Sequence, residues 1–195
     1  IQSSGKIAMK LSDDDKLIGV HTCTEKEHDV FLSTKEGKCL RFPISNVRKF
    51  SGRNSVGVRG IKLGKKDTVI SMYILKHAKF SMEERNDYLK IANAIRRKEL
   101  RRSLPYNKLS KDTKLDEKKF VEMENLEEFI LSVADNGYGK RSSAYEYRIT
   151  SRGGKGIANM TVNKKTGNVV SSFPINEKDD VMLIAGTGKL IRSPV

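Results

Sequence analysis

The chain has 195 residues, of which 37% are hydrophobic, and it contains no apolar run long enough for a transmembrane helix. This composition predicts a soluble protein with a real hydrophobic core and excludes a membrane-spanning one. Lys and Arg number 38 against 24 Asp and Glu, so the formal net charge is +14. Such a positive field favours a polyanion as partner, above all nucleic acid, over the simpler alternative of a well-solvated surface.

The first part of the chain, residues 1–75, consists of short alternating runs separated by turns. Ile7, Met9 and Leu11 alternate with mostly basic neighbours, and residues 17–20 form a second apolar run after an acidic turn. Alternation with period two is typical of half-buried strands, so we expect strands at both places.

A hairpin is predicted from Asp29 to Phe42, because two alternating runs flank a turn that contains Gly37. Its expected inward residues are Val30, Leu32, Cys39 or Leu40, and Phe42. Residues 45–59 then form a connecting corner in which arginines stand among Ser, Asn and Gly. Small residues allow a phosphate backbone to approach closely, and arginine binds phosphate oxygens in bidentate fashion.

Residues 76–125 interrupt this pattern with a predicted helical insertion. Ser81 and Glu84 have the spacing of a capping box, and apolar residues then follow with a helical step until Pro105. We expect a helix from about Met82 to Arg102, a polar loop over residues 107–119, and a short second helix through Phe120, Met123 and Leu126. The basic end of the first helix is either an extra contact to DNA or protein, or an ordinary exposed helix end.

The strand pattern resumes in the last part, residues 126–195. Phe129 to Val133 is an apolar run too short for a buried helix, and the turn Asp135-Asn136-Gly137 follows it. Tyr138, Tyr145 and Tyr147 lie among basic residues, where tyrosines either contact nucleic acid or, as we favour, fill seams between sheets.

The hairpins are copies of one unit. An arginine follows the turn glycine by four residues at Gly37 and Arg41, and the same spacing recurs at 137–141 and at 188–192. The unit recurs about every fifty residues, with several strands per period, which is typical of a propeller-like array of four-stranded blades. The predicted fold class is therefore all-β with an α-helical insertion. Because such arrays need neighbouring units, we expect the chain to be part of a longer protein.

The candidate site is the basic set that the repeat places near turns and corners. The sharpest feature is Arg152-Gly-Gly-Lys-Gly156, where consecutive glycines free the backbone and expose N–H groups beside two cations. The predicted DNA-binding residues are Lys38, Arg41, Arg48, Arg53, Arg59, Lys140, Arg141, Arg152, Lys155, Lys189 and Arg192.

Other kinds of site are not supported by the residues present. The acidic turn at 13–15 lacks the glycine and distal glutamate of a calcium loop, and the two cysteines have no zinc spacing. The run Gly186-Thr-Gly-Lys189 lacks the Ser or Thr of a phosphate-binding loop. We therefore expect no catalytic residue, metal or cofactor in this chain. Two thiols without a signal-peptide pattern predict a cytoplasmic location.

Several runs together resemble the C-terminal domain of the A subunit of bacterial DNA gyrase. They are Gly5-Lys-Ile-Ala-Met-Lys-Leu, Val56-Gly-Val-Arg-Gly-Ile-Lys-Leu, Asn136-Gly-Tyr-Gly-Lys-Arg and Arg152-Gly-Gly-Lys-Gly-Ile. The resemblance covers the chain apart from the insertion. It implies a β-pinwheel whose basic rim wraps duplex DNA. It also implies a parent enzyme, an ATP-dependent topoisomerase that introduces negative supercoils, in which a dimer of A subunits forms a heterotetramer with B subunits and other domains bind ATP and Mg²⁺.

One departure concerns the family's box, Gln-Arg-Arg-Gly-Gly-Lys-Gly, of which Thr150 to Gly156 is a partial copy without the glutamine and the first arginine. The corresponding domain of topoisomerase IV therefore remains an alternative to gyrase. A propeller-like module that binds an acidic protein is the alternative from another class. A steep salt dependence of DNA binding would separate DNA wrapping from that module.

Overall fold

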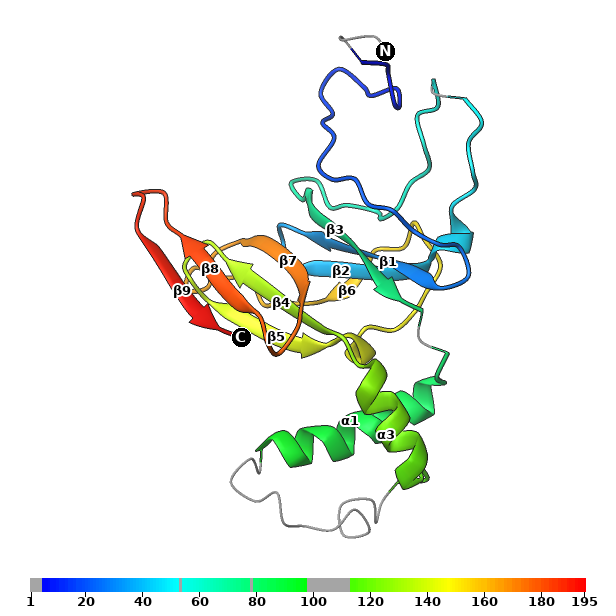
Figure 1. The fold of residues 1–195 in the computed structure, drawn as a ribbon. Coiled ribbons are helices and arrows are strands. Elements are labelled where there is room, and N and C mark those ends of the chain that lie inside the picture. Colours follow the sequence, from blue (N-terminus) through cyan, green and yellow to red (C-terminus); the bar gives the residue numbers. More distant parts are fainter. Residues whose placement is uncertain (1–4, 53, 78, 98–112) are drawn as a thin grey trace. The chain divides into compact units, whose positions relative to one another are not determined.

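A computed structural model of the chain describes residues 5–52, 54–77, 79–97 and 113–195 (Figure 1). The chain forms two compact units, each built from several segments. Unit 1 comprises residues 1–77, 132–140 and 149–173, and unit 2 comprises residues 78–131, 141–148 and 174–195. This division by compactness differs from the sequence division into residues 1–75, 76–125 and 126–195, because it groups segments by contact and not by chain order.

Unit 1 contains a four-stranded sheet with the strand order β3-β1-β2-β6. Strands β1 (His28–Thr34) and β2 (Lys38–Pro43) form the predicted hairpin, and β3 (Val69–Lys76) and β6 (Ile157–Ala158) pair with its two sides. All three pairings are antiparallel. A segment more than a hundred residues away in sequence thus completes the sheet, as a four-stranded blade requires.

Both faces of the β1–β2 hairpin are buried. Val30, Leu32, Leu40 and Phe42 join Ile61 in one hydrophobic cluster, which confirms the predicted inward set. On the alternate positions, Phe31 is 1% exposed and Cys39 is 0% exposed. The hairpin therefore packs on both faces, and polar residues within it, such as Asp29 and Arg41, are buried as well.

The second half of the chain repeats these elements. Strands β4 (Phe129–Ala134), β5 (Gly139–Ser143) and β7 (Val169–Ile175) form a sheet in the order β5-β4-β7. Strands β8 (Asp180–Ile184) and β9 (Leu190–Pro194) form a hairpin. The 3-10 turns η1 (Ile44–Asn46) and η2 (Ala144–Glu146) follow β2 and β5 at equivalent positions.

The turn glycines explain the spacing of the repeat. Gly37, Gly137 and Gly188 all have positive φ, at 78°, 81° and 82°. A side chain at such a φ is strained, so these positions favour glycine and fix where each hairpin reverses.

The insertion is helical, as predicted, and lies in unit 2. Helix α1 (Met82–Arg97) begins with the expected capping box, in which the Glu84 N–H donates to Ser81 Oγ at 3.2 Å and the Ser81 N–H donates to Glu84 Oε2 at 2.8 Å. The predicted continuation to Arg102 lies outside the described residues. Helix α3 (Glu117–Leu126) confirms the second helix, and Asp116 caps it by accepting from the Lys119 N–H at 2.8 Å.

Aromatic packing joins the two helices to η2. Tyr88 on α1 stacks near Phe120 on α3, with ring centroids 5.0 Å apart, and meets Tyr145 edge-on at 5.3 Å. The Tyr145 hydroxyl donates to the Met123 carbonyl at 3.0 Å. Tyr145 thus belongs to a structural core, but it packs against the helical insertion and not in a seam between sheets as the sequence predicted.

The strands expected at residues 5–11 and 17–20 are wrong, because neither segment is a strand. Ile7, Leu17 and Val20 are 68%, 55% and 77% exposed. The alternating pattern was present, but a strand also needs a paired neighbour along its length. Between residues 5 and 11, the only backbone hydrogen bond to another segment among the described residues runs from the Lys10 N–H to the Ser55 carbonyl, at 3.2 Å.

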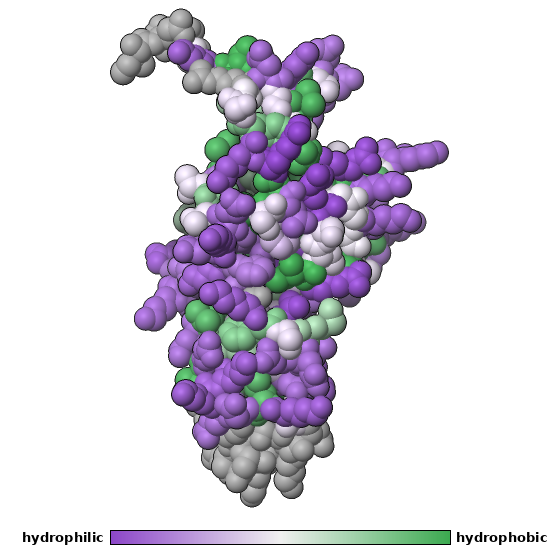
Figure 2. All heavy atoms as spheres, turned by 90° about the vertical axis from the view of Figure 1, so that its right-hand side faces the viewer, coloured by the Kyte–Doolittle hydropathy of each residue, from purple (hydrophilic) through white to green (hydrophobic). Residues whose placement is uncertain are grey.

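In Figure 2, most side chains on the face toward the viewer are hydrophilic, and apolar residues form small patches between them. No helix in the described ranges has the length and apolar character needed to cross a membrane.

Candidate nucleic-acid interface

Two glycine-rich corners of unit 1 lie against each other, although they are almost a hundred residues apart in sequence. The Gly153 N–H donates to the Gly60 carbonyl at 2.5 Å, and the Lys62 N–H donates to the Gly154 carbonyl at 2.8 Å. Gly153 has a φ of 80°. These backbone bonds place the run 57–62 beside the run 152–156.

Arg152 stabilises the pairing of the two corners by hydrogen bonds. Its Nε donates to the Asn46 carbonyl at 2.8 Å, and its Nη1 donates to the Arg59 carbonyl at 3.1 Å. The guanidinium therefore joins the 3-10 turn η1 to the first glycine corner. The sequence predicted Arg152 as a phosphate contact, whereas its hydrogen bonds in the structure hold the neighbouring cations in place.

Exposed cations surround the paired corners. Arg59, Lys62 and Lys155 stand on the two runs, and all three are exposed. Lys38 is exposed on β2 opposite Ala158 of β6, and Lys140 donates from Nζ to the Asn159 carbonyl at 3.2 Å. We call this group the basic corner; its members are Lys38, Arg59, Lys62, Lys140 and Lys155.

The basic corner suits a phosphate backbone. Its cations lie on flexible stems around backbone with little side-chain bulk, so a polyanion can approach and be neutralised without reading of bases. Lys62 was missing from the predicted set. Its position within Gly57-Val-Arg-Gly-Ile-Lys, one of the recurring runs, was the signal that could have identified it.

Arg41 is a correction to the prediction. Its side chain is 1% exposed, and its Nε donates to Asp29 Oδ2 at 2.8 Å. A second guanidinium nitrogen donates to the Lys76 carbonyl at 2.7 Å. A buried guanidinium that is already hydrogen-bonded is not available to a phosphate. Arg41 therefore stabilises the fold.

The arginine that recurs in each hairpin contacts the residue twelve positions before it in all three copies. Arg41 and Arg192 each follow an aspartate by twelve residues, and both pair with it: Arg192 Nε donates to Asp180 Oδ2 at 2.7 Å. In the middle copy, Phe129 replaces the aspartate, and the Arg141 guanidinium lies over its ring at 5.1 Å. The spacing that suggested DNA contacts is therefore also the spacing of a diagonal contact across each hairpin.

The remaining predicted residues lie elsewhere. Arg48 is exposed, with its guanidinium 4.6 Å from the Phe50 ring centroid, and Arg53 lies outside the described residues. Arg141, Lys189 and Arg192 are exposed and belong to unit 2. The structure thus gathers Lys38, Arg59, Lys140 and Lys155 from the predicted set into the basic corner.

The thiols have different environments. Burial raises the pKa of the Cys39 thiol to about 12, although the nearby Lys140 acts in the opposite direction. Cys39 therefore stays protonated and unreactive at neutral pH. Cys23 is exposed. Within the described part of the chain, His, Cys, Asp and Glu side chains form no group of three that could hold a metal ion.

The family comparison agrees with the architecture. The family described as DNA gyrase C-terminal domain, beta-propeller, matches residues 2–24, 28–76 and 128–176. The matched ranges omit the helical insertion and include both glycine corners. The all-β propeller-like fold expected from the repeat is thereby confirmed.

Whole proteins similar to the chain include DNA gyrase A subunits. The one from Rickettsia bellii is 50% identical over 192 residues, which is 98% of this chain and 21% of that protein. The one from Escherichia coli is 32% identical over 195 residues, which is 100% of this chain and 16% of that protein. The chain thus spans about a fifth of the length of these relatives.

Solved structures with a similar fold include a DNA gyrase A C-terminal domain and the C-terminal domain of DNA topoisomerase IV. The first has a TM-score of 0.65 at 22% identity and covers 98% of this chain and 48% of that one. The second has a TM-score of 0.64 at 16% identity and covers 96% and 43%. At these identities, the two structures show a shared fold.

Proposed function

Because the chain belongs to the family of DNA gyrase C-terminal β-propeller domains, we propose that it binds duplex DNA through the basic corner and wraps it. The observation that carries this proposal is the hydrogen-bonded pairing of the two glycine corners, which gathers exposed cations from distant parts of the sequence. Binding would depend on charge and backbone access, and therefore on salt concentration more than on base sequence.

The parent protein would be the A subunit of a gyrase. Identity to gyrase A subunits of up to 50% over nearly the whole chain supports gyrase over topoisomerase IV, for which the likeness is one of fold. In this assignment, a dimer of A subunits works with B subunits in the cytoplasm, and ATP and Mg²⁺ act through other domains. The wrapped duplex would then serve ATP-dependent negative supercoiling.

A salt titration tests the DNA-binding part. Dissociation constants of the chain for linear duplexes of two unrelated sequences would be measured at several salt concentrations. We expect the same affinity for both duplexes and a steep log–log slope, about −0.9 for each phosphate neutralised. A flat slope, or stronger binding to an acidic protein than to DNA, would favour a protein-interaction module.

Matched double variants locate the site. Arg59→Ala with Lys155→Ala removes two charges from the basic corner and should reduce the magnitude of the salt slope by about 2. The control, Lys16→Ala with Lys26→Ala, removes the same charge from lysines that are exposed and lie outside the two glycine-rich runs. Equal losses in both variants would mean that net charge alone matters and that the corner is no site.

A supercoiling assay tests the role in the parent enzyme. The complete A protein carrying the corner variant would be combined with its B partner and relaxed plasmid. We expect ATP-dependent negative supercoiling to fall while ATP-independent relaxation persists, because wrapping sets the direction of strand passage and cleavage lies in another domain. Supercoiling equal to that of the unmodified enzyme would show that the basic corner takes no part in supercoiling.

A further inference from the structure

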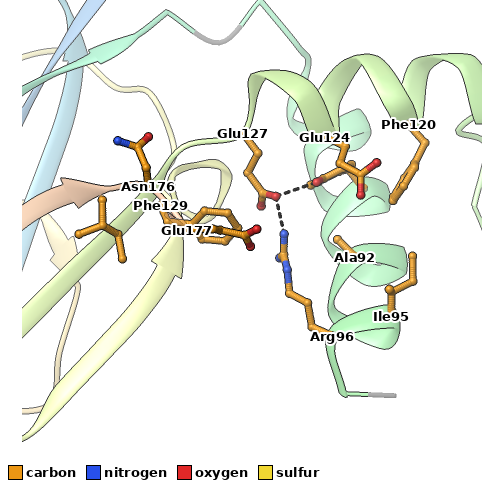
Figure 3. Close-up of a pocket in the computed structure, with 11 residues that line it drawn as sticks. Ala92, Ile95, Arg96, Phe120, Glu124, Glu127, Phe129, Asn176 and Glu177 are labelled. Carbon is orange, nitrogen blue, oxygen red and sulfur yellow. Dashed lines mark hydrogen bonds and ion pairs between the residues drawn. The ribbon is translucent and has the colours of Figure 1, made fainter. Parts of the chain in front are cut away.

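Unit 2 contains a pocket between helices α1 and α3 and the segment that follows β7. Figure 3 shows the side chains that line it. Its volume is about 350 Å³, which is sufficient for a small ligand or one long side chain. Its apolar walls come from both helices and from the start of β4. They include Ala92, Ile95, Phe120 and Phe129.

The charged residues of the pocket are mostly acidic. Glu124, Glu127 and Glu177 line it, and Arg96 is the one cation among its described lining residues. Arg96 already pairs with Glu127 and lies over the Phe129 ring at 4.9 Å. Glu124 and Glu177 are exposed, and no ion pair joins either of them to another described residue. An anionic pocket is unexpected on a chain with a net charge of +14.

Glu127 is the buried member of this group. Its side chain is 3% exposed, and Oε2 accepts from both the Tyr88 hydroxyl, at 2.7 Å, and the Arg96 guanidinium. The other oxygen, Oε1, is buried and has no hydrogen-bond partner among the described residues. A buried carboxylate oxygen without a donor is costly, so a donor that reached it would be bound favourably.

The Tyr88 hydroxyl remains a donor under ordinary conditions. Burial, followed by the charge of Glu127, raises the pKa of Tyr88. Tyr88 and Arg96 therefore both stay on the Oε2 side of Glu127. Oε1 is therefore the oxygen of Glu127 that has no donor among the described residues, and Glu127 lines the pocket.

We propose that this pocket binds an aliphatic primary ammonium group. A –NH₃⁺ group has three donors and no acceptor, which suits the unpaired carboxylates of Glu124 and Glu177 and the Oε1 atom of Glu127, with no unpaired cation among the described lining residues. Its alkyl stem would pack on Ala92, Ile95 and Phe120 while the charge meets Glu124, Glu127 and Glu177. The ligand is either a free polyamine or a lysine side chain of a protein, and the chemistry recognised is the same.

Calorimetric titrations of the 195-residue chain test the proposal. Spermidine and N-acetyl-lysine methylamide represent the two sources of the ammonium group. Ammonium chloride supplies charge without a stem, and the Nζ-acetylated form of the lysine compound supplies a stem without charge. We expect saturable binding of at least one of the first two ligands and none of the last two. No saturable binding of either amine would overturn the proposal.

Matched variants tie the binding to the pocket. Glu124→Gln with Glu177→Gln should weaken binding roughly tenfold, since each substitution removes a modest, partly solvent-screened attraction to the ammonium group. The control, Glu117→Gln with Glu122→Gln, removes the same charge from exposed residues of α3 outside the pocket lining and should leave the dissociation constant unchanged. Equal weakening by both variants would show that only general charge attraction is measured.

The relative affinities of spermidine and the lysine compound identify the source of the ammonium group. Tighter binding of spermidine would indicate a free polyamine, and tighter binding of the lysine compound would indicate a protein partner. The site uses residues of unit 2, whereas the proposed DNA contacts lie in unit 1. Loss of DNA binding in the corner variant and loss of amine binding in the pocket variant are therefore separate results.

Discussion

The hairpins β1–β2 and β8–β9 carry the same motif in opposite environments. Each has a glycine of positive φ at its turn and an Asp–Arg pair across it. The side chains of Arg41 and Asp29 are 1% and 0% exposed, whereas those of Arg192 and Asp180 are 74% and 35% exposed. The repeat therefore fixes the geometry of the pair, and burial decides whether the arginine acts in stability or is available to a ligand.

The largest expected effect comes from removing the buried partner. Arg41→Ala leaves the Asp29 carboxylate buried without its guanidinium, and the free energy of unfolding should fall by about 3–5 kcal/mol. Urea denaturation followed by circular dichroism measures this. A loss below about 1 kcal/mol would mean that Asp29 is compensated by its other contact, His77, whose Nδ1 lies 2.7 Å from Asp29 Oδ1.

The turn glycines give the next effect, and they form a matched pair. Gly37→Ala and Gly188→Ala both strain a positive φ, at about 1–2 kcal/mol each. At Gly37 a Cβ would also stand 2.1 Å from the Met160 carbonyl oxygen, whereas at Gly188 it would meet no described atom within 4 Å. We expect Gly37→Ala to cost about 1–3 kcal/mol more. Equal losses in denaturation would show that the Met160 segment moves aside freely.

The burial of the Cys39 thiol should make the free energy of unfolding depend on pH. Its folded pKa of about 12 lies above the ordinary value of 9.0, so the unfolded chain loses the proton first as pH rises. The stability gained from keeping the thiol neutral is present below pH 9 and is lost between the two values, at up to about 1.4 kcal/mol per pH unit. The stability difference between the unmodified chain and Cys39→Ala should therefore shrink from pH 8 to pH 10. A constant difference would mean that the thiol is hydrated.

The exposed pair should give the smallest effect. Arg192→Ala should change the free energy of unfolding by only about 0–1 kcal/mol, because solvent screens the pair with Asp180. The same variant measured for DNA affinity shows whether an exposed hairpin arginine takes part in binding. A stability loss as large as that of Arg41→Ala would contradict the difference between the two hairpins.

Much of the fold could be predicted because it depends on local chemistry. Alternation and a turn glycine predicted the hairpin at 29–42, and the Ser81–Glu84 capping box predicted the start of α1. Residues 5–20 show where local chemistry is insufficient. Their alternating pattern is real, yet strands form only where a second strand supplies hydrogen bonds, and a local pattern does not reveal that partner.

The candidate site was predicted less completely, for a related reason. The sequence identified cations near turns, and four of them lie in the basic corner. It missed Lys62, and it assigned Arg41 to DNA although Asp29 stood twelve residues before it. The function of a cation depends on its burial and on the acceptors within reach, and both come from residues that are distant in sequence.

By itself, the sequence determined the repeat, the turn positions, the helical insertion and the basic character of the chain, because glycine conformation, strand alternation and helix capping act over a few residues. The tertiary structure alone decided which cations are exposed together, which arginine is buried against an aspartate, and where an acidic pocket lies on a basic chain. Those outcomes depend on which distant segments exclude water from a side chain, and solvent exclusion sets the strength of every charge interaction.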